Sequence, residues 1–232
     1  MQFSLQAVEK HGKYMEAVKV TRRAKGEKTR EKILKAAIEV IASVGIKGTT
    51  HRAVAKKADA QLSLTTYYFK DIKELIREAI ILSSTIFIES SSGIWHKVFA
   101  YLDEFDATSM RKVTTREEIC HKVTDAATQH MYENIIHRPV GLAVEQIFFT
   151  EMMYQPELQD LAIAHVEKLR QPFIKLASYF NKVDPEIDAE LALMTITRIQ
   201  YQCLSQDKND VDIEQIRKLV YRQLAWVLKL KR

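Results

Sequence analysis

The strongest constraint on the fold is a stretch of helical periodicity that ends abruptly at a glycine. Between residues 27 and 44, apolar side chains recur every three or four positions, which is the spacing of one face of an α-helix. Gly45 follows the last of them directly, and a glycine in this place is typical of a helix C-terminus. The sequence therefore predicts a helix over residues 27–44 that ends at Gly45.

Two short helical segments follow this helix. Thr49 and Thr50 each offer a hydroxyl group that can cap the N-terminus of a helix over residues 50–58. Residues 59–61 predict a tight turn, and residues 62–68 predict a second short helix. Two short helices that pack on a preceding helix form a helix-turn-helix unit, and the second of them can enter the major groove of DNA.

The rest of the chain predicts further helices and no strands. Asp71 and Glu74 have the spacing of a capping box, which marks the start of another helix. The six glycines and four prolines are few for 232 residues, and no hairpin signal is present. We expect an all-α fold of about ten helices. After the helix that begins at Asp71, the remaining ones are expected near residues 94–105, 116–136, 139–153, 156–181, 185–205 and 212–230.

The same pattern predicts a division of the chain into three parts. Residues 1–26 are polar and end in a cluster of basic residues, so we expect a loosely ordered basic arm with a short helix near residues 4–18. Residues 27–75 are expected to form an N-terminal three-helix helix-turn-helix domain. Residues 76–232 are expected to form a larger helical domain.

Charge is distributed unevenly along the chain. Residues 19–77 contain 15 Lys and Arg against six Asp and Glu, a balance of +9, whereas residues 78–232 have a balance of −4. Such asymmetry suggests that the basic part binds a polyanion, such as a nucleic acid. The alternative is a solvated basic surface without a partner.

Cysteine usage and hydropathy predict a soluble cytoplasmic protein. Cys120 and Cys203 lie far apart and form no disulfide framework, which favours a reducing compartment. The N-terminus lacks the apolar region of a secretory signal. The longest uncharged apolar stretch, around residues 80–88, is much shorter than the roughly 20 residues that span a bilayer. We therefore expect no association with a membrane.

Residues 27–80 combine several features of one DNA-binding domain. These features are the apolar first helix, Gly-x-x-Gly-Thr-Thr at 45–50, Ala55, Ala58, Tyr-Tyr-Phe at 67–69, Lys73 and Leu75. In these features the stretch resembles the DNA-binding domain of the TetR family of bacterial regulators, and it departs from the family at Asp59, where glycine is frequent, and at Thr66, where many members have an aromatic residue. The resemblance implies an all-α dimer in which each subunit has an N-terminal DNA-binding domain and a larger helical ligand-binding domain.

The resemblance also implies which side chains contact DNA. Polar residues at the start of the second short helix would face the groove, and basic residues would contact phosphates. Phe69 is instead expected to anchor the core of the domain. The expected DNA-binding residues are Lys28, Arg30, Thr50, Arg52, Gln61, Ser63, Thr65, Thr66, Tyr67, Tyr68 and Lys73.

The larger domain is expected to hold a ligand pocket and a dimer interface. Aromatic and methionine side chains gather in residues 85–205, which suits either an apolar pocket or an ordinary helical core. By resemblance, the helices near 185–205 and 212–230 would pair with those of a second subunit, and intrachain packing is the alternative. The candidate pocket residues are Trp95, Phe99, Tyr132, Phe148, Met152 and Phe173.

An enzymatic function finds little support in the sequence. Glu118 and His121 match the Glu-x-x-His motif of helical di-iron enzymes, but such a site needs a second copy, which the sequence lacks. His130 and His137 are a weak hint of metal sensing. We expect no catalytic residues, bound metal or cofactor.

The predicted function is a sequence-specific transcriptional regulator. We expect a repressor that binds a palindromic double-stranded DNA operator as a dimer and responds to a small-molecule effector. An activator, or a DNA-binding protein on the same scaffold that ignores ligands, is the alternative. A helical metal-dependent enzyme is a more remote one.

Overall fold

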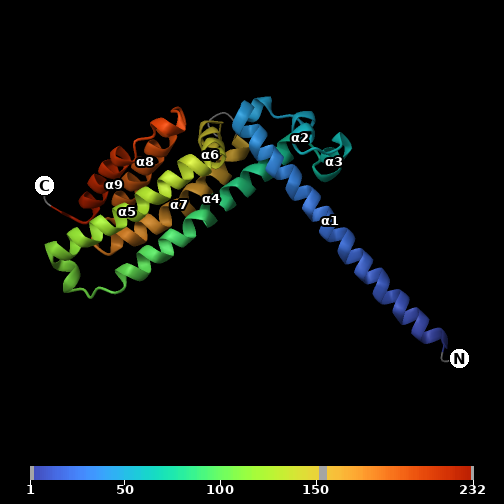
Figure 1. Ribbon diagram of the computed structural model, residues 1–232, viewed down its shortest axis with the longest axis horizontal. Helices are drawn as coiled ribbons and strands as arrows, with labels where there is room; N and C mark the ends of the chain where they lie inside the picture. Colours follow the sequence, from blue (N-terminus) through green and yellow to red (C-terminus); the bar gives the residue numbers. More distant parts are fainter. Residues whose placement is uncertain (1–2, 152–155, 231–232) are drawn as a thin grey trace. The chain divides into compact units, whose positions relative to one another are not determined.

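The computed structural model describes the backbone of residues 3–151 and 156–230, and the side chains of residues 25–151, 156 and 158–230. Within these ranges the chain forms nine α-helices and three short 3₁₀ helices, and no strand (Figure 1). The expected all-α fold is therefore confirmed. No helix in this part of the chain is long and apolar enough to cross a membrane.

The chain divides into two compact units, Met1–Ala79 and Ile80–Arg232. The division falls four residues after the boundary expected from the sequence at residues 75 and 76. Helix α4 (Ile72–Leu102) begins in the first unit and ends in the second. The backbone of this one helix therefore connects the two units.

Helix α1 (Phe3–Gly48) is the longest helix of the first unit, drawn in blue in Figure 1. Its backbone is interrupted at Gly45, where φ is 73° and ψ is 175°, so the regular helix ends where the sequence predicted. The backbone of residues 3–26 is helical, whereas the sequence analysis expected a loosely ordered arm there. The stretch has no proline and contains four Lys and three Ala, residue types that favour a helix.

The two short helices form as predicted. Helix α2 (His51–Lys57) begins after Thr50, whose hydroxyl accepts a hydrogen bond of 3.1 Å from the backbone N–H of Ala53. Helix α3 (Leu62–Tyr68) follows after a turn in which Asp59 has a positive φ of 45°. Phe69 is fully buried, which confirms its predicted place in the core of the unit. The other fully buried side chains of this core include Ile33, Ile41, Val54 and Leu75.

Helix α4 begins with the predicted capping interaction. The carboxylate of Asp71 accepts from the backbone N–H of Glu74 at 2.9 Å, and the Glu74 carboxylate accepts from the N–H of Lys70 at 2.6 Å. The sequence analysis placed a separate helix at 94–105, but α4 continues through this region. Ser90 and Ser92 do not interrupt α4, because their hydroxyls donate to backbone carbonyls of the preceding turn.

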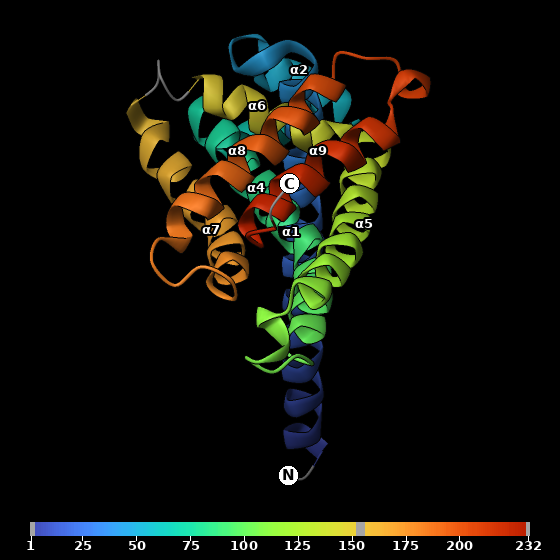
Figure 2. The same cartoon turned by 90° about the vertical axis from the view of Figure 1, so that its left-hand side faces the viewer.

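The second unit contains the C-terminal part of α4 and five further helices. Helix α5 packs against α9, and α8 packs against both α7 and α9 (Figure 2). Pro139 and Pro185 are each the first residue of a helix, where the missing N–H costs nothing. The five helices are α5 (Val113–His137), α6 (Pro139–Glu151), α7 (Gln159–Ser178), α8 (Pro185–Cys203) and α9 (Ile213–Val227). The 3₁₀ helices are η1 (Ser109–Arg111), η2 (Pro156–Leu158) and η3 (Lys208–Asp210).

Candidate nucleic-acid interface and ligand cavity

Helix α3 presents a polar face to solvent at its N-terminal end. Gln61, Ser63 and Thr66 are exposed, and 78% of Tyr67 is accessible. These side chains carry hydrogen-bond donors and acceptors and one aromatic ring. Such a face suits contacts to base edges and phosphates.

For Thr65, the expected position at the DNA interface was wrong. It was expected to face the groove, but its side chain is fully buried and its hydroxyl donates to the carbonyl of Leu62 at 2.8 Å. Thr65 lies four residues before Phe69, so the two side chains share the inward face of the short helix and its end. Thr65 therefore belongs to the core, and its neighbour Thr66 lies on the exposed side.

Tyr68 and Arg30 have more contacts within the first unit than the sequence suggested. Tyr68 is half-buried, and its hydroxyl lies 3.5 Å from the position that a Cβ would take at Gly26. The guanidinium of Arg30 is 3.1 Å from the Glu78 carboxylate and 5.1 Å from the centre of the Phe69 ring. Arg30 of α1 therefore contacts both α4 and Phe69 at the end of α3. These contacts can hold α3 in position.

The remaining expected contacts are on the surface of the first unit. Lys28, Arg52 and Lys73 are exposed, and Thr50 is exposed while it caps α2. A residue of α1 contacts the turn before α3, because the ammonium group of Lys32 donates a hydrogen bond to the Asp59 carbonyl at 3.3 Å. Asp59 thus adopts the positive φ that glycine often adopts at this turn, and the contact with Lys32 stabilises it there.

The second unit encloses an apolar cavity of about 130 Å³ between α4, α5, α6, α7, α8 and α9. Aromatic rings form one wall. Trp95 of α4 stacks on Phe99 at 5.6 Å between ring centres and meets Phe173 of α7 edge-on at 4.8 Å. A cavity of this composition can hold the apolar body of a small molecule.

The candidate pocket residues fall in different places. Trp95 and Phe173 line the cavity, whereas Phe99 and Tyr132 are not among its lining residues. Phe148 is buried and lines a smaller neighbouring cavity. Met152 lies outside the described residues.

Polar side chains that the sequence analysis did not select also line the cavity. Glu145 of α6 and Asp188 of α8 are both more than nine-tenths buried. Asn134 of α5 is 2% exposed, and its amide nitrogen lies 3.1 Å from Nε2 of His130. Selection by aromatic and methionine content could not find these residues, because each sits singly within an ordinary helical pattern.

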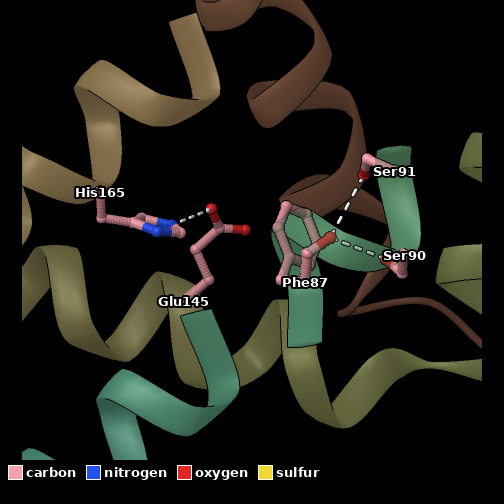
Figure 3. Close-up of polar contacts among 5 residues, drawn as sticks. All are labelled: Phe87, Ser90, Ser91, Glu145 and His165. Carbon is pink, nitrogen blue, oxygen red and sulfur yellow. Dashed lines mark hydrogen bonds and ion pairs between the residues drawn. The ribbon is translucent and has the colours of Figure 1, made fainter. Parts of the chain in front are cut away.

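Glu145 lines both cavities. Its Oε1 atom is 3.0 Å from Nε2 of the buried His165 on α7. Figure 3 shows the carboxylate between the ring of His165 and the ring of Phe87. In the same view, the hydroxyls of Ser90 and Ser91 donate to the Phe87 carbonyl at 2.7 and 3.3 Å. A carboxylate that is more than nine-tenths buried is thus paired with the ring of a buried histidine.

Glu118 and His121, the two residues of the Glu-x-x-His motif, each contact a tyrosine side chain. Glu118 accepts a hydrogen bond of 3.2 Å from the Tyr101 hydroxyl, and the ring of His121 packs on that of Tyr221 at 4.8 Å. In the part of the chain that the structure describes, no three His, Cys, Asp or Glu residues are grouped so that they could hold a metal ion.

Comparison with known proteins adds a family match and a fold match. Residues 33–79 match the family model described as bacterial regulatory proteins, tetR family. No curated protein sequence matches the chain.

The fold match extends over both units. A TetR-like transcriptional regulator from Rhodococcus sp. RHA1 is 16% identical with a TM-score of 0.61, over 88% of this chain and 97% of that one. A member of the TetR family from Streptomyces coelicolor A3 is 22% identical with a TM-score of 0.56, over 84% and 97%. The multidrug binding protein EbrR, complexed with ethidium, is 23% identical with a TM-score of 0.54, over 84% and 97%.

Proposed function

We propose that this chain, whose residues 33–79 match the family model of bacterial regulatory proteins of the tetR family, is a ligand-responsive repressor that binds a palindromic operator as a homodimer. The family match supports a DNA-binding transcriptional regulator. The observation that carries the proposal is the exposed polar face of α3, in a unit whose surface also presents Lys28, Arg52 and Lys73.

Contact with DNA is supported by the side chains that α3 leaves free of the core. Gln61, Ser63, Thr66 and Tyr67 lie on its exposed side. The major groove is about 12 Å wide and admits one helix, so α3 is the recognition helix in this proposal. Lys28, Arg52 and Lys73 supply positive charge that suits the phosphate backbone.

Dimerisation is supported by an apolar stripe that α8 leaves exposed. Ile187, Leu191 and Met194 recur at helical spacing and are 59%, 44% and 59% exposed. On α9, Leu219 and Trp226 are 41% and 70% exposed. Apolar side chains grouped in this way mark an interaction surface, and a second copy of the chain is the occupant that a two-fold operator requires.

The ligand response is supported by the cavity of the second unit and by the path of α4. The cavity is lined by Trp95 on α4, and the same helix starts three residues after Phe69, which ends α3. EbrR, which has a similar fold, binds ethidium. In the proposed mechanism, a ligand in the cavity favours a position of α4 in which the two recognition helices no longer match half-sites one turn, about 34 Å, apart.

Selection of DNA from a random pool tests the proposal. The full chain should enrich an inverted repeat, and its affinity should fall steeply with salt because phosphate contacts release counterions. Tyr67→Ala should weaken binding about tenfold, which is a typical loss for one base or phosphate contact. Ile163→Ala is the control, because Ile163 is an exposed apolar residue of α7 in the other unit. Enrichment of no sequence, or equal losses in both variants, would contradict the proposed interface.

A further inference from the structure

We infer that the cavity of the second unit takes a ligand with an apolar body and a protonated amine, held by Asn134 and by the carboxylates of Glu145 and Asp188. The inference rests on the proposed function, because it names the chemical class of the effector. It follows from two features of the cavity wall, which are a buried amide oxygen without a partner and two buried carboxylates.

The first observation is an acceptor with no partner. Oδ1 of Asn134 is buried and makes no hydrogen bond within the described residues. The other end of the same amide is engaged, since its nitrogen lies 3.1 Å from Nε2 of His130. An amide nitrogen only donates, so Nε2 of His130 accepts, and Asn134 lines the cavity with its oxygen unsatisfied. A buried acceptor of this kind costs free energy unless a donor reaches it.

The state of His130 agrees with this assignment. Burial lowers the pKa of His130, so the ring is neutral at pH 7 and one of its nitrogens is free to accept. Nε2 is also 3.3 Å from the hydroxyl of Ser91 on α4. His130 therefore adds no positive charge to the cavity, and it leaves the carboxylates there without a cationic neighbour on α5.

The second observation is the pair of buried carboxylates. Asp188 accepts a hydrogen bond of 2.9 Å from the amide of Asn181, which carries no charge. Glu145 is held by His165 at 3.0 Å, on the side of the smaller cavity. The cation that lines the cavity, Lys168, is exposed at its edge. A buried carboxylate needs a charge partner or several hydrogen bonds, and a ligand ammonium group can supply both.

The apolar wall limits the rest of the ligand. Phe87, Trp95 and Phe173 surround a space of about 130 Å³. An apolar cavity of about 150 Å³ accepts benzene, so a space of about 130 Å³ limits the apolar body of the ligand to about one aromatic ring. The aromatic faces also favour a cation close to them.

Three compounds with one skeleton test the ligand class. The probes are benzylamine, benzyl alcohol and benzoate, which share one aromatic ring with one further carbon atom and carry a positive, neutral or negative head group. Trp95 reports binding by fluorescence in the full chain carrying Trp226→Phe, since the sequence contains two tryptophans. The amine should bind at least about tenfold more tightly than the other two compounds, which is the gain expected for a hydrogen bond to a charged group.

Two variants and a matched control locate the head group. Glu145→Gln should weaken binding of the amine about tenfold and leave binding of the alcohol unchanged. Asn134→Leu should weaken binding of both the amine and the alcohol, because each of them donates a hydrogen bond. Glu167→Gln removes the same charge from the exposed face of α7, outside the cavity, and should change neither affinity. Equal or tighter binding of the alcohol or the carboxylate would overturn the inference. So would an absence of saturable binding by the amine, or an equal loss in Glu167→Gln.

The test separates this inference from the proposed function through a second measurement. Fluorescence anisotropy of labelled operator DNA reports release when each probe is added. If the amine binds selectively but the DNA stays bound, the ligand class holds and the ligand-responsive repressor is contradicted. If the carboxylate releases the DNA and the amine does not, the repressor holds and the ligand class is wrong.

Discussion

At the scale of single residues, neighbouring side chains on α3 have opposite surroundings. Thr65 is fully buried and bonds its hydroxyl to the carbonyl of Leu62, whereas Thr66 is exposed and bonds to the carbonyl of Ser63. Both residues were expected at the DNA interface, because hydroxyl groups at adjacent positions look alike in a sequence. The structure assigns one to stability and leaves the other for the proposed contact with DNA.

This difference predicts opposite outcomes for the same substitution. Thr65→Asp should lower the free energy of unfolding by about 3 kcal/mol or more, because it buries a carboxylate without a partner. Thr66→Asp should keep the stability of the wild type and weaken DNA binding about tenfold or more, through repulsion from phosphates. Urea unfolding and a DNA-binding titration measure the two effects. A stable Thr65→Asp variant would refute the placement of this side chain.

The buried His130 predicts how stability depends on pH. Burial holds the pKa of His130 below its ordinary value in the folded chain. The unfolded chain therefore binds the proton at a higher pH than the folded chain. The contribution of His130 is fully present above the unfolded pKa of about 6.5 and is lost as the pH falls below it, down to the lower pKa of the folded state.

Urea unfolding at pH 7.5 and pH 5.5 measures this loss. The wild type should lose more stability over this range than His130→Gln, whose amide does not titrate. His96→Gln is the control, because His96 is an exposed histidine on α4. If His130→Gln keeps the full pH dependence, other groups cause it.

At the scale of elements, glycine has different roles at the end and in the middle of a helix. Gly45 ends the regular part of α1 with φ of 73° and ψ of 175°, a region that other residues avoid. Gly93 lies within α4, and a Cβ there would meet nothing within 4 Å. The sequence analysis used glycine as a stop signal in the first case. In the second case the helix continues, because hydrogen bonding and packing along α4 outweigh one weak helix former.

The two glycines predict shifts of opposite sign for the same change. Gly45→Ala should lower the free energy of unfolding by about 1–3 kcal/mol, since alanine is strained at this φ and ψ. Gly93→Ala should raise it by about 0.5–1 kcal/mol, because alanine favours a helix and here meets no neighbour. Thermal and urea unfolding of both variants checks the signs. Stabilisation by Gly45→Ala would contradict the described end of α1.

At the scale of the whole molecule, the proposed dimer depends on the exposed faces of α8 and α9. The sequence analysis gave a dimer interface and intrachain packing as alternatives for these two helices, without separating their two sides. In the structure, Ile199, Ile216 and Val220 are buried within the second unit, whereas Ile187 and Met194 are exposed. The helices therefore have one side for intrachain packing and one side that a second copy would cover.

Met194→Glu should convert the proposed dimer to a monomer, because it places a charge in an apolar interface. Stability of the monomer should change little, since 59% of Met194 is exposed. Ile163→Glu is the control on α7, where an equally apolar residue is 68% exposed. Sedimentation velocity measures the mass of each variant. A Met194→Glu variant that remains dimeric would move the interface elsewhere.

The features that depend on neighbours along the chain could be predicted from local sequence patterns. These are the helix that ends at Gly45, the cap at Thr50, the capping interaction at Asp71 and the core position of Phe69. Each follows from backbone geometry, hydrogen bonding at helix ends or helical periodicity, which act over a few residues. The family resemblance of residues 27–80 rests on the same local pattern, and the family match over residues 33–79 agrees with it.

Contacts between side chains from distant segments became evident only in the folded chain. The cavity brings together Asn134, Glu145 and Asp188, which are spread over three helices and carry no shared motif. Burial of Thr65 and exposure of Met194 also depend on what packs against their helices. Packing joins residues far apart in sequence, so the location of the recognition helix could be predicted, whereas the chemistry of the cavity became evident only in the folded chain.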